Sequence, residues 1–293
     1  MDLNDLLRKQ EIDPEQVLVL RHRPSESRLN KVLPWLAAER PELFNAYQQT
    51  QGEQLEKAML GASYVASFIG HEPSKALFIG LYSIGASKRL SRQEYWKIPS
   101  YIEMKSRWDL KGFTEEESRP YVLWFELTLR TDFYASWKGR LVVSWPPPER
   151  SWWRRAHRNE MNVLAILEDS ALDAGMPAWD EMQLTSEELS VLPKRWRLAL
   201  SHWRGIYYIF DVSNRSGYVG SAYGESNLCQ RWENYGATGH GGNRLLKERD
   251  PRNFRFSILE RVSPDMGAED VIRLESKWKE RLHTRFPLGL NDN

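Results

Sequence analysis

Two short apolar runs near the C-terminus constrain the fold more than any other part of this sequence. They lie at residues 205–209 and 218–222, and each carries a tyrosine, Tyr207 in the first and Tyr218 in the second. Residues 211–217 (DVSNRSG) are rich in Asn, Ser and Gly, so the runs are predicted to be adjacent antiparallel strands joined by a turn. Because side chains on one face of such a pair lie close together, we expect both tyrosine hydroxyls to face the same pocket.

The next segment has the pattern of a helix followed by a glycine-rich loop. Residues 227–235 have the apolar spacing of a short amphipathic helix. Arg231 and Tyr235 are four positions apart and should therefore lie on one face of it. The loop that follows, at 238–242, contains His240.

The remaining C-terminal segments complete a small domain. A second short helix is predicted at 243–248, a third strand at 254–260, and a longer helix at 267–284 with Glu275 near its middle. Asn291 follows close to the end of the chain. The pattern predicts an α+β fold in which a three-stranded antiparallel sheet is flanked by helices.

The tripeptides GIY at 205–207 and YVG at 218–220, with this order of segments, resemble the GIY-YIG nuclease family. The resemblance covers about the last third of the chain. It implies a metal-dependent DNA endonuclease with Glu275 as the metal ligand. The catalytic residues that it implies are Tyr207, Tyr218, Arg231, Tyr235, His240, Glu275 and Asn291.

The chemistry of phosphodiester hydrolysis suits these residue types. The reaction needs an activated water, positive charge on the phosphate oxygens and help for the leaving oxygen. The guanidinium of Arg231 is a planar fork of donors that matches phosphate. Tyr207, with an ordinary pKa of about 10, is a general base only beside a metal ion or a basic side chain. Glu275 would hold one Mg²⁺ or Mn²⁺ together with water and substrate phosphate. The groups expected to bond the phosphate or orient the water are Tyr218, Tyr235 and His240.

Each of these residues also has an ordinary structural interpretation. A strand tyrosine is usually a half-buried packing residue, and a helical glutamate beside the basic stretch 277–281 usually forms a solvated ion pair worth little. Asn291 lies where fraying is expected. A non-catalytic nucleic-acid-binding module with the same fold is therefore the alternative function. The presence together of both tyrosines, the arginine and the glutamate favours the enzyme.

The N-terminal part is predicted to be a second domain, residues 1–197, with the nuclease-like domain at 198–293. Helices are expected at 2–10 and 30–48. Short β-rich runs are expected at 64–70, 76–84, 122–129 and 140–145. Their spacing predicts a β-barrel or curled sheet over about 60–160. This part is loosely similar to PUA-like and EVE-like base-sensing barrels, which implies DNA recognition. The rings proposed to line a pocket for a flipped base are Tyr82, Trp96, Trp108 and Trp124.

One segment of this domain interleaves basic and aromatic side chains between residues 137 and 158. Such a pattern holds phosphates while rings stack on unpaired bases. The predicted DNA-binding residues are Lys138, Arg140, Arg150, Trp152, Trp153, Arg154, Arg155 and Arg158. The alternative is a core tryptophan cluster fringed by solubilising arginines.

Composition limits the class of protein. The net charge is only +1, so any DNA-binding surface must be a local patch. A single cysteine, Cys229, rules out a disulfide framework. The acidic N-terminus and the lack of a membrane-length apolar run predict a cytoplasmic protein with no membrane partner. The expected role is restriction of foreign or modified double-stranded DNA. One site per chain makes a homodimer a possible requirement for a double-strand break.

Overall fold

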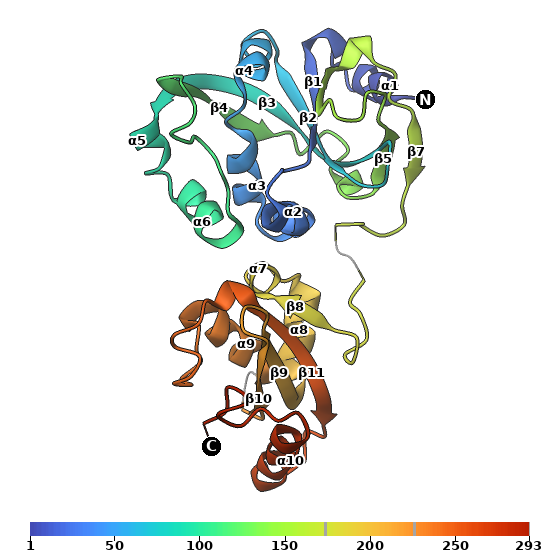
Figure 1. Ribbon diagram of the computed structural model, residues 1–293. Helices are drawn as coiled ribbons and strands as arrows, with labels where there is room; N and C mark the ends of the chain where they lie inside the picture. The colour runs from blue at the N-terminus through green and yellow to red at the C-terminus, as the bar shows by residue number, and fades with distance from the viewer. Residues whose placement is uncertain (173–174, 225–226, 293) are drawn as a thin grey trace. The chain divides into compact units, whose positions relative to one another are not determined.

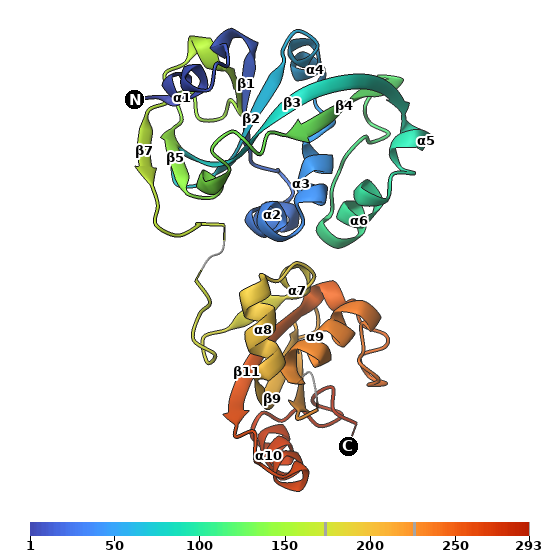
Figure 2. The ribbon, with the colours of Figure 1, turned by 180° about the vertical axis from the view of Figure 1, so that it is seen from behind.

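The computed structural model describes residues 1–172, 175–224 and 227–292 (Figures 1 and 2). The chain divides into two compact units, 1–174 and 175–293, and the predicted α+β class is confirmed. The boundary had been predicted at 197/198. It lies earlier because a short strand at 183–185 pairs with the C-terminal sheet. In the described part of the chain, no helix is long and apolar enough to cross a membrane.

Unit 1 contains one seven-stranded mixed sheet. Its strands are β1 (Val17–His22), β2 (Tyr64–Gly70), β3 (Lys75–Ser91), β4 (Tyr121–Leu129), β5 (Leu141–Ser144), β6 (Trp153–Arg155) and β7 (Val163–Ile166). The order is β6-β1-β2-β3-β5-β7, and β4 pairs with the second half of β3. Of the two predicted arrangements, a β-barrel or a curled sheet, the structure has the curled sheet, because β3 is 17 residues long and curves between two sets of partners. Its end strands β6 and β7 do not pair with each other in the region that the structure describes.

Helices cover both faces of this sheet. They are α1 (Leu3–Lys9), α2 (Ser27–Glu39), α3 (Pro41–Gln48), α4 (Glu53–Met59), α5 (Arg92–Tyr95) and α6 (Pro99–Trp108). Leucines of α1 pack against Phe68 and Phe78 on one face. Leu33 of α2 and Phe44 of α3 pack against Leu77 on the other. Strand β1, which lies between β6 and β2, was not predicted, although all six of its residues are buried.

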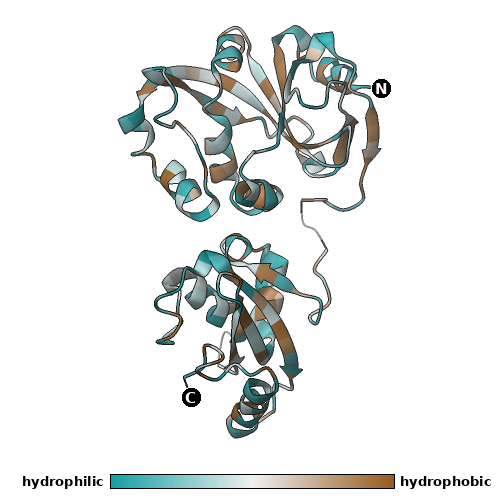
Figure 3. Ribbon diagram, in the orientation of Figure 1, coloured by the Kyte–Doolittle hydropathy of each residue, from teal (hydrophilic) through white to brown (hydrophobic). Residues whose placement is uncertain are grey.

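Unit 2 contains a four-stranded antiparallel sheet in the order β10-β9-β11-β8. Its strands are β8 (Gln183–Thr185), β9 (Arg204–Asp211), β10 (Ser216–Ala222) and β11 (Phe254–Val262). Its helices are α7 (Ser186–Leu189), α8 (Lys194–His202), α9 (Asn227–Thr238) and α10 (Ala268–Arg281). Hydrophobic residues run along the longer strands, whereas α10 is mostly hydrophilic (Figure 3).

Two details of unit 2 differ from the sequence prediction. The sheet has four strands rather than three, because β8 adds to the free edge of β11. Residues 243–248 form turns rather than a helix. The Asn243 side chain accepts hydrogen bonds from the backbone N–H groups of Leu245 and Leu246, as a helix N-cap does, but the turns that follow do not continue as a regular helix.

Candidate active site

Three tyrosines from three elements converge on one face of the unit 2 sheet. Gly220 of β10 lies opposite Tyr207 of β9, and Tyr218 lies opposite Ile209, so the two tyrosines are diagonal neighbours on the same face, as the hairpin pattern predicted. Tyr235 reaches them from α9. The ring centroids are 6.4 Å apart for Tyr207 and Tyr218, and 6.1 and 5.9 Å from Tyr235 to these two rings.

The three phenols form a compact group that stays neutral at physiological pH. The Tyr207 hydroxyl donates to the Tyr235 hydroxyl over 3.3 Å. Burial is the largest cause that raises the pKa of each phenol, and Tyr207 is only 1% exposed. Tyr207 is therefore not a ready phenolate base. It can act as a hydrogen-bonding group and as a link in a proton relay.

Two glycines allow the rings to approach. A Cβ at Gly220 would lie 2.4 Å from the Tyr207 hydroxyl oxygen and 2.5 Å from Cζ. A Cβ at Gly241 would lie 2.6 Å from the Tyr235 ring, and Gly241 has φ of +51°. The loop that contains Gly241 therefore packs against Tyr235. His240 belongs to this loop, but its Nδ1 accepts the Gly242 backbone N–H at 2.9 Å and bonds none of the three tyrosines.

Arg231 lies one turn before Tyr235 on α9, and it is exposed. Its charge lowers the pKa of all three phenols, against the larger effect of burial, so the guanidinium lies within electrostatic reach of them. Among the residues that the structure describes, no carboxylate forms an ion pair with Arg231. The guanidinium is therefore available to an anionic ligand.

Glu275 of α10 approaches the same edge strand from the other face of the sheet. Its Oε2 accepts a hydrogen bond from the Ser221 hydroxyl of β10, and its Oε1 lies 2.7 Å from the Lys279 ammonium nitrogen. The side chain of Glu275 is 18% exposed and that of Lys279 only 5%. The Glu275 charge raises the pKa of Tyr207 and Tyr218, although less than burial does. Lys279 is buried beside the site, and its role there was not predicted. The only sequence signal for this contact was its position four residues after Glu275 on the same helix.

Asn291 supports β10 from the C-terminal segment. Its amide donates to the Val219 carbonyl at 2.8 Å and its Oδ1 accepts the Val219 N–H at 3.0 Å, so the side chain continues the sheet at its free edge. Asn291 is 1% exposed, and its own backbone N–H donates to the Thr284 carbonyl. The expectation of fraying was wrong. Asn291 therefore holds the backbone of Val219, which follows Tyr218 in β10.

The residues offer limited support for a metal ion. In the part of the chain that is described, no group of three or more His, Cys, Asp and Glu side chains could hold one. Glu275 is a single carboxylate whose two oxygens already have partners. One carboxylate together with substrate phosphate and water is a usual arrangement for Mg²⁺. The site therefore fits an ion only in the presence of a phosphate ligand.

The predicted DNA-binding residues of unit 1 fall into two groups. The side chains of Arg150, Trp152 and Arg158 are exposed, and Arg155 of β6 is half-buried. Arg150 and Trp152 line a cleft in unit 1. Arg158 donates to the neighbouring His157 ring at 3.1 Å.

The other members of the set have structural contacts. Arg154 donates to the carbonyls of Pro146 and Pro148 at 3.1 and 3.0 Å. Arg140 donates to the Leu167 carbonyl at 2.7 Å, and Trp153 packs against a core cluster. Burial lowers the pKa of Lys138. The four rings proposed for a base pocket do not line the cleft. Tyr82 and Trp108 belong to the core, Trp96 donates to the Phe113 carbonyl, and Trp124 lies under Lys88.

No family model and no curated protein matches this chain. Among solved structures, it is similar to the catalytic domain of the homing endonuclease I-TevI, with 26% sequence identity. The match covers 31% of this chain and 98% of that one, and its TM-score is 0.26. A superposition this weak does not establish a shared fold or activity. The resemblance to GIY-YIG nucleases therefore has one weak structural neighbour and no family-model match.

Proposed function

We propose that unit 2 is an endonuclease that hydrolyses phosphodiester bonds of double-stranded DNA. The observation that carries the proposal is the cluster of three phenols, two of them hydrogen-bonded, beside an arginine with no ion-pair partner among the described residues. Arg231 would bind the non-bridging oxygens of the phosphate and neutralise the charge that grows there.

The phenols would move the proton of the attacking water. A neutral phenol has both a lone pair and a proton, so Tyr207 can accept the water proton while its own proton passes to Tyr235. From Tyr235 a proton would pass to Tyr218, whose ring centroid lies 5.9 Å away, and Tyr218, the partly exposed member of the group, would give its own proton to the leaving oxygen. No phenolate has to form, which agrees with the raised pKa of each tyrosine.

Glu275 would hold a Mg²⁺ or Mn²⁺ ion, which supplies Lewis-acid stabilisation of the phosphate when it is bound. Lys279 lies 2.7 Å from the same carboxylate, so the ammonium and the ion would share it. This contact also favours a second candidate function, in which Lys279 closes the site and unit 2 binds nucleic acid without cutting it.

Unit 1 would supply DNA recognition through exposed groups such as Arg150 and Trp152. A restriction-type role in the cytoplasm against foreign or modified DNA is part of the proposal. A double-strand break would then require two chains or two binding events, because each chain has one candidate site.

The test compares cleavage of plain plasmid DNA with cleavage of DNA that carries modified cytosines, with and without Mg²⁺. Glu275→Gln keeps the shape of the side chain and removes its charge, so we expect cleavage to fall at least about 100-fold while DNA binding survives. Lys277→Ala, an exposed change on the same helix, is the matched control. Wild-type turnover in Glu275→Gln would remove this residue from the mechanism. DNA binding without cleavage by the wild type would favour the second function.

A further inference from the structure

Unit 1 contains a cleft with a volume of about 860 Å³. It is formed mainly by the end of β1 and the residues after it (21–26), the end of α3 and the next turn (47–52), and the loops 110–119 and 149–152. This volume lies within the range of about 300–1,000 Å³ that is usual for sites that bind one small ligand. None of the residues that line it belongs to the tyrosine cluster.

The lining of the cleft has more cationic than anionic side chains. The cations are Arg21, Arg23, Lys111, Arg119 and Arg150, and the carboxylates are Glu26, Glu117 and Glu149. Each carboxylate already accepts a hydrogen bond inside unit 1, from the Lys111 N–H, the Arg119 guanidinium and the Ser74 hydroxyl respectively. Three of the cations, Arg23, Lys111 and Arg150, are exposed. The rim therefore favours an anionic group.

Arg21 is a buried cation in this lining with an unused donor. The residue is 3% exposed, and its guanidinium lies 4.7 Å from the Trp145 ring centroid. Its Nη2 donates to the Glu149 carbonyl. Its Nε has no hydrogen-bond partner among the residues that the structure describes. Buried polar groups are normally paired, so Arg21 is a cation in the lining whose hydrogen bonding within the chain is incomplete.

Aromatic rings form the walls. They are Tyr47, Tyr95, Phe113 and Trp152. Tyr95 is stacked on Tyr101 at 4.1 Å and 5°, which fixes its orientation. Trp152 is 36% exposed, so part of its ring is open to a ligand. Tyr95 and Phe113 are only 2% and 1% exposed, and Arg92 and Arg119 lie over the Phe113 ring. The surface open to a flat ligand ring is therefore that of Trp152 and of the partly exposed Tyr47.

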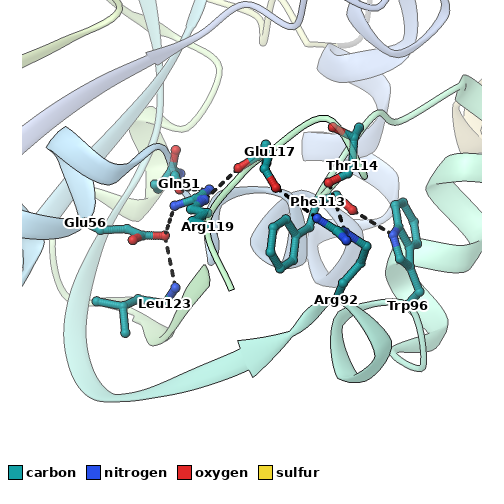
Figure 4. A network of polar contacts seen from close by, with 9 residues as sticks. All are labelled: Gln51, Glu56, Arg92, Trp96, Phe113, Thr114, Glu117, Arg119 and Leu123. Atoms are coloured by element: carbon teal, nitrogen blue, oxygen red, sulfur yellow. Dashed lines mark hydrogen bonds and ion pairs between the residues drawn. The ribbon is translucent and has the colours of Figure 1, made fainter. Parts of the chain in front are cut away.

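Hydrogen bonds hold one wall in place before any ligand binds (Figure 4). Arg119 donates to the Glu56 carboxylate at 2.9 Å and to the Gln51 carbonyl at 3.2 Å. Arg92 donates to the Glu117 carbonyl at 3.0 Å. The Trp96 indole donates to the Phe113 carbonyl at 2.9 Å. The Phe113 side of the cleft is therefore preorganised.

We propose that this cleft binds a single nucleotide, with the base against Trp152 and Tyr47 and the phosphate beside Arg21 and Arg150. A purely anionic ligand would leave the open ring of Trp152 without a contact, and a purely apolar one would leave the cations of the rim without a partner. A nucleotide satisfies both. Its favoured source is an unpaired position in a DNA strand, and this choice of source rests on the proposed function. A free mononucleotide has the same chemistry and is the other source.

The experiment measures binding to the full-length chain in EDTA, so that hydrolysis does not affect the result. The probes are a short duplex with one base opposite an abasic site, the fully paired duplex, and the mononucleotides dAMP and dCMP. We expect the unpaired base to improve the affinity about tenfold, or about 1.4 kcal/mol. Trp152→Ala and Arg150→Ala, both surface changes, should each abolish the preference. Lys9→Ala, which removes an exposed cation of unit 1 that does not line the cleft, should keep it.

The protein could bind mononucleotides in a way that depends on Arg150 and Trp152 and still show no preference between the two duplexes. This result would assign the cleft to free nucleotides. Equal affinity for both duplexes together with no such mononucleotide binding would overturn the proposal. So would a preference that persists in both variants. Either of these results would refute the nucleotide site without refuting the proposed nuclease, whose cleavage is measured separately in Mg²⁺. Absence of cleavage with the binding preference intact would instead refute only the nuclease.

Discussion

Gly220→Ala tests whether the position of the Tyr207 ring matters. The new Cβ would lie 2.4 Å from the phenol oxygen, whereas ordinary contact begins at 3.4 Å. The ring must therefore move by about 1 Å, and a displacement of this size costs about 100-fold in rate when it affects a reacting group. Overpacking of this buried position should also lower the free energy of unfolding by about 1–3 kcal/mol.

The assay is single-turnover nicking of supercoiled plasmid, with urea denaturation of the same samples. Gly236→Ala is the matched control, because its Cβ would meet nothing within 4 Å and alanine favours a helix interior. We expect wild-type nicking and slightly higher stability for this control. A folded Gly220→Ala protein that nicks at the wild-type rate would refute the role given to the position of Tyr207.

Three further outcomes follow from the structure. Asn291→Ala should lower the free energy of unfolding by about 2–4 kcal/mol in urea denaturation, because both backbone groups of Val219 lose their partner; a change below about 0.5 kcal/mol would contradict this. Burial lowers the pKa of His22 from 6.5 to about 4, so the unfolded chain binds this proton first as the pH falls. Stability should therefore decrease by about 3 kcal/mol between pH 6.5 and 4, and less in His22→Gln; equal pH profiles would exclude His22 as the cause. Lys279→Met should destabilise the protein by about 3 kcal/mol because it leaves Glu275 partly buried without its cation, and adding Glu275→Gln should restore most of that loss; additive losses in thermal unfolding would argue against the pair.

The local patterns of unit 2 predicted much of its structure. The hairpin followed from two β-rich runs and a turn, and α9 and α10 followed from apolar spacing. The fourth strand, β8, was not predicted. Its three residues have no alternating pattern of their own, and they are extended because β11 offers a free edge. Long-range pairing of this kind leaves little local signal in a sequence.

In unit 1 the strands were easier to predict than their arrangement. β2 has the predicted bounds, but β3 continues to Ser91 and changes partners along its length, which gives a curled sheet rather than the barrel that was the other predicted arrangement. The parallel pairing of β1 with β2 joins segments separated by three helices. Nothing in either segment alone specifies its partner.

For the candidate site, the sequence predicted which tyrosines share a face, because side-chain alternation in a hairpin is a local property. It did not predict the role of Asn291, which depends on the C-terminal segment returning to the edge of β10. The raised pKa of Tyr207 was also missed, because burial depends on Tyr235 and the rest of the domain rather than on the strand.

The most direct test of the proposed mechanism compares the wild type with Tyr207→Phe in single-turnover cleavage of DNA that the protein binds, in the presence of Mg²⁺. Phenylalanine keeps the packing and removes one hydroxyl and its bond to Tyr235, so unfolding free energies should agree within about 1 kcal/mol. We predict that the wild type cuts and that Tyr207→Phe is at least about 100-fold slower. Equal cleavage rates, or no cleavage by a wild-type protein that binds the DNA, would contradict the proposal that the tyrosine cluster is a phosphodiester hydrolysis site.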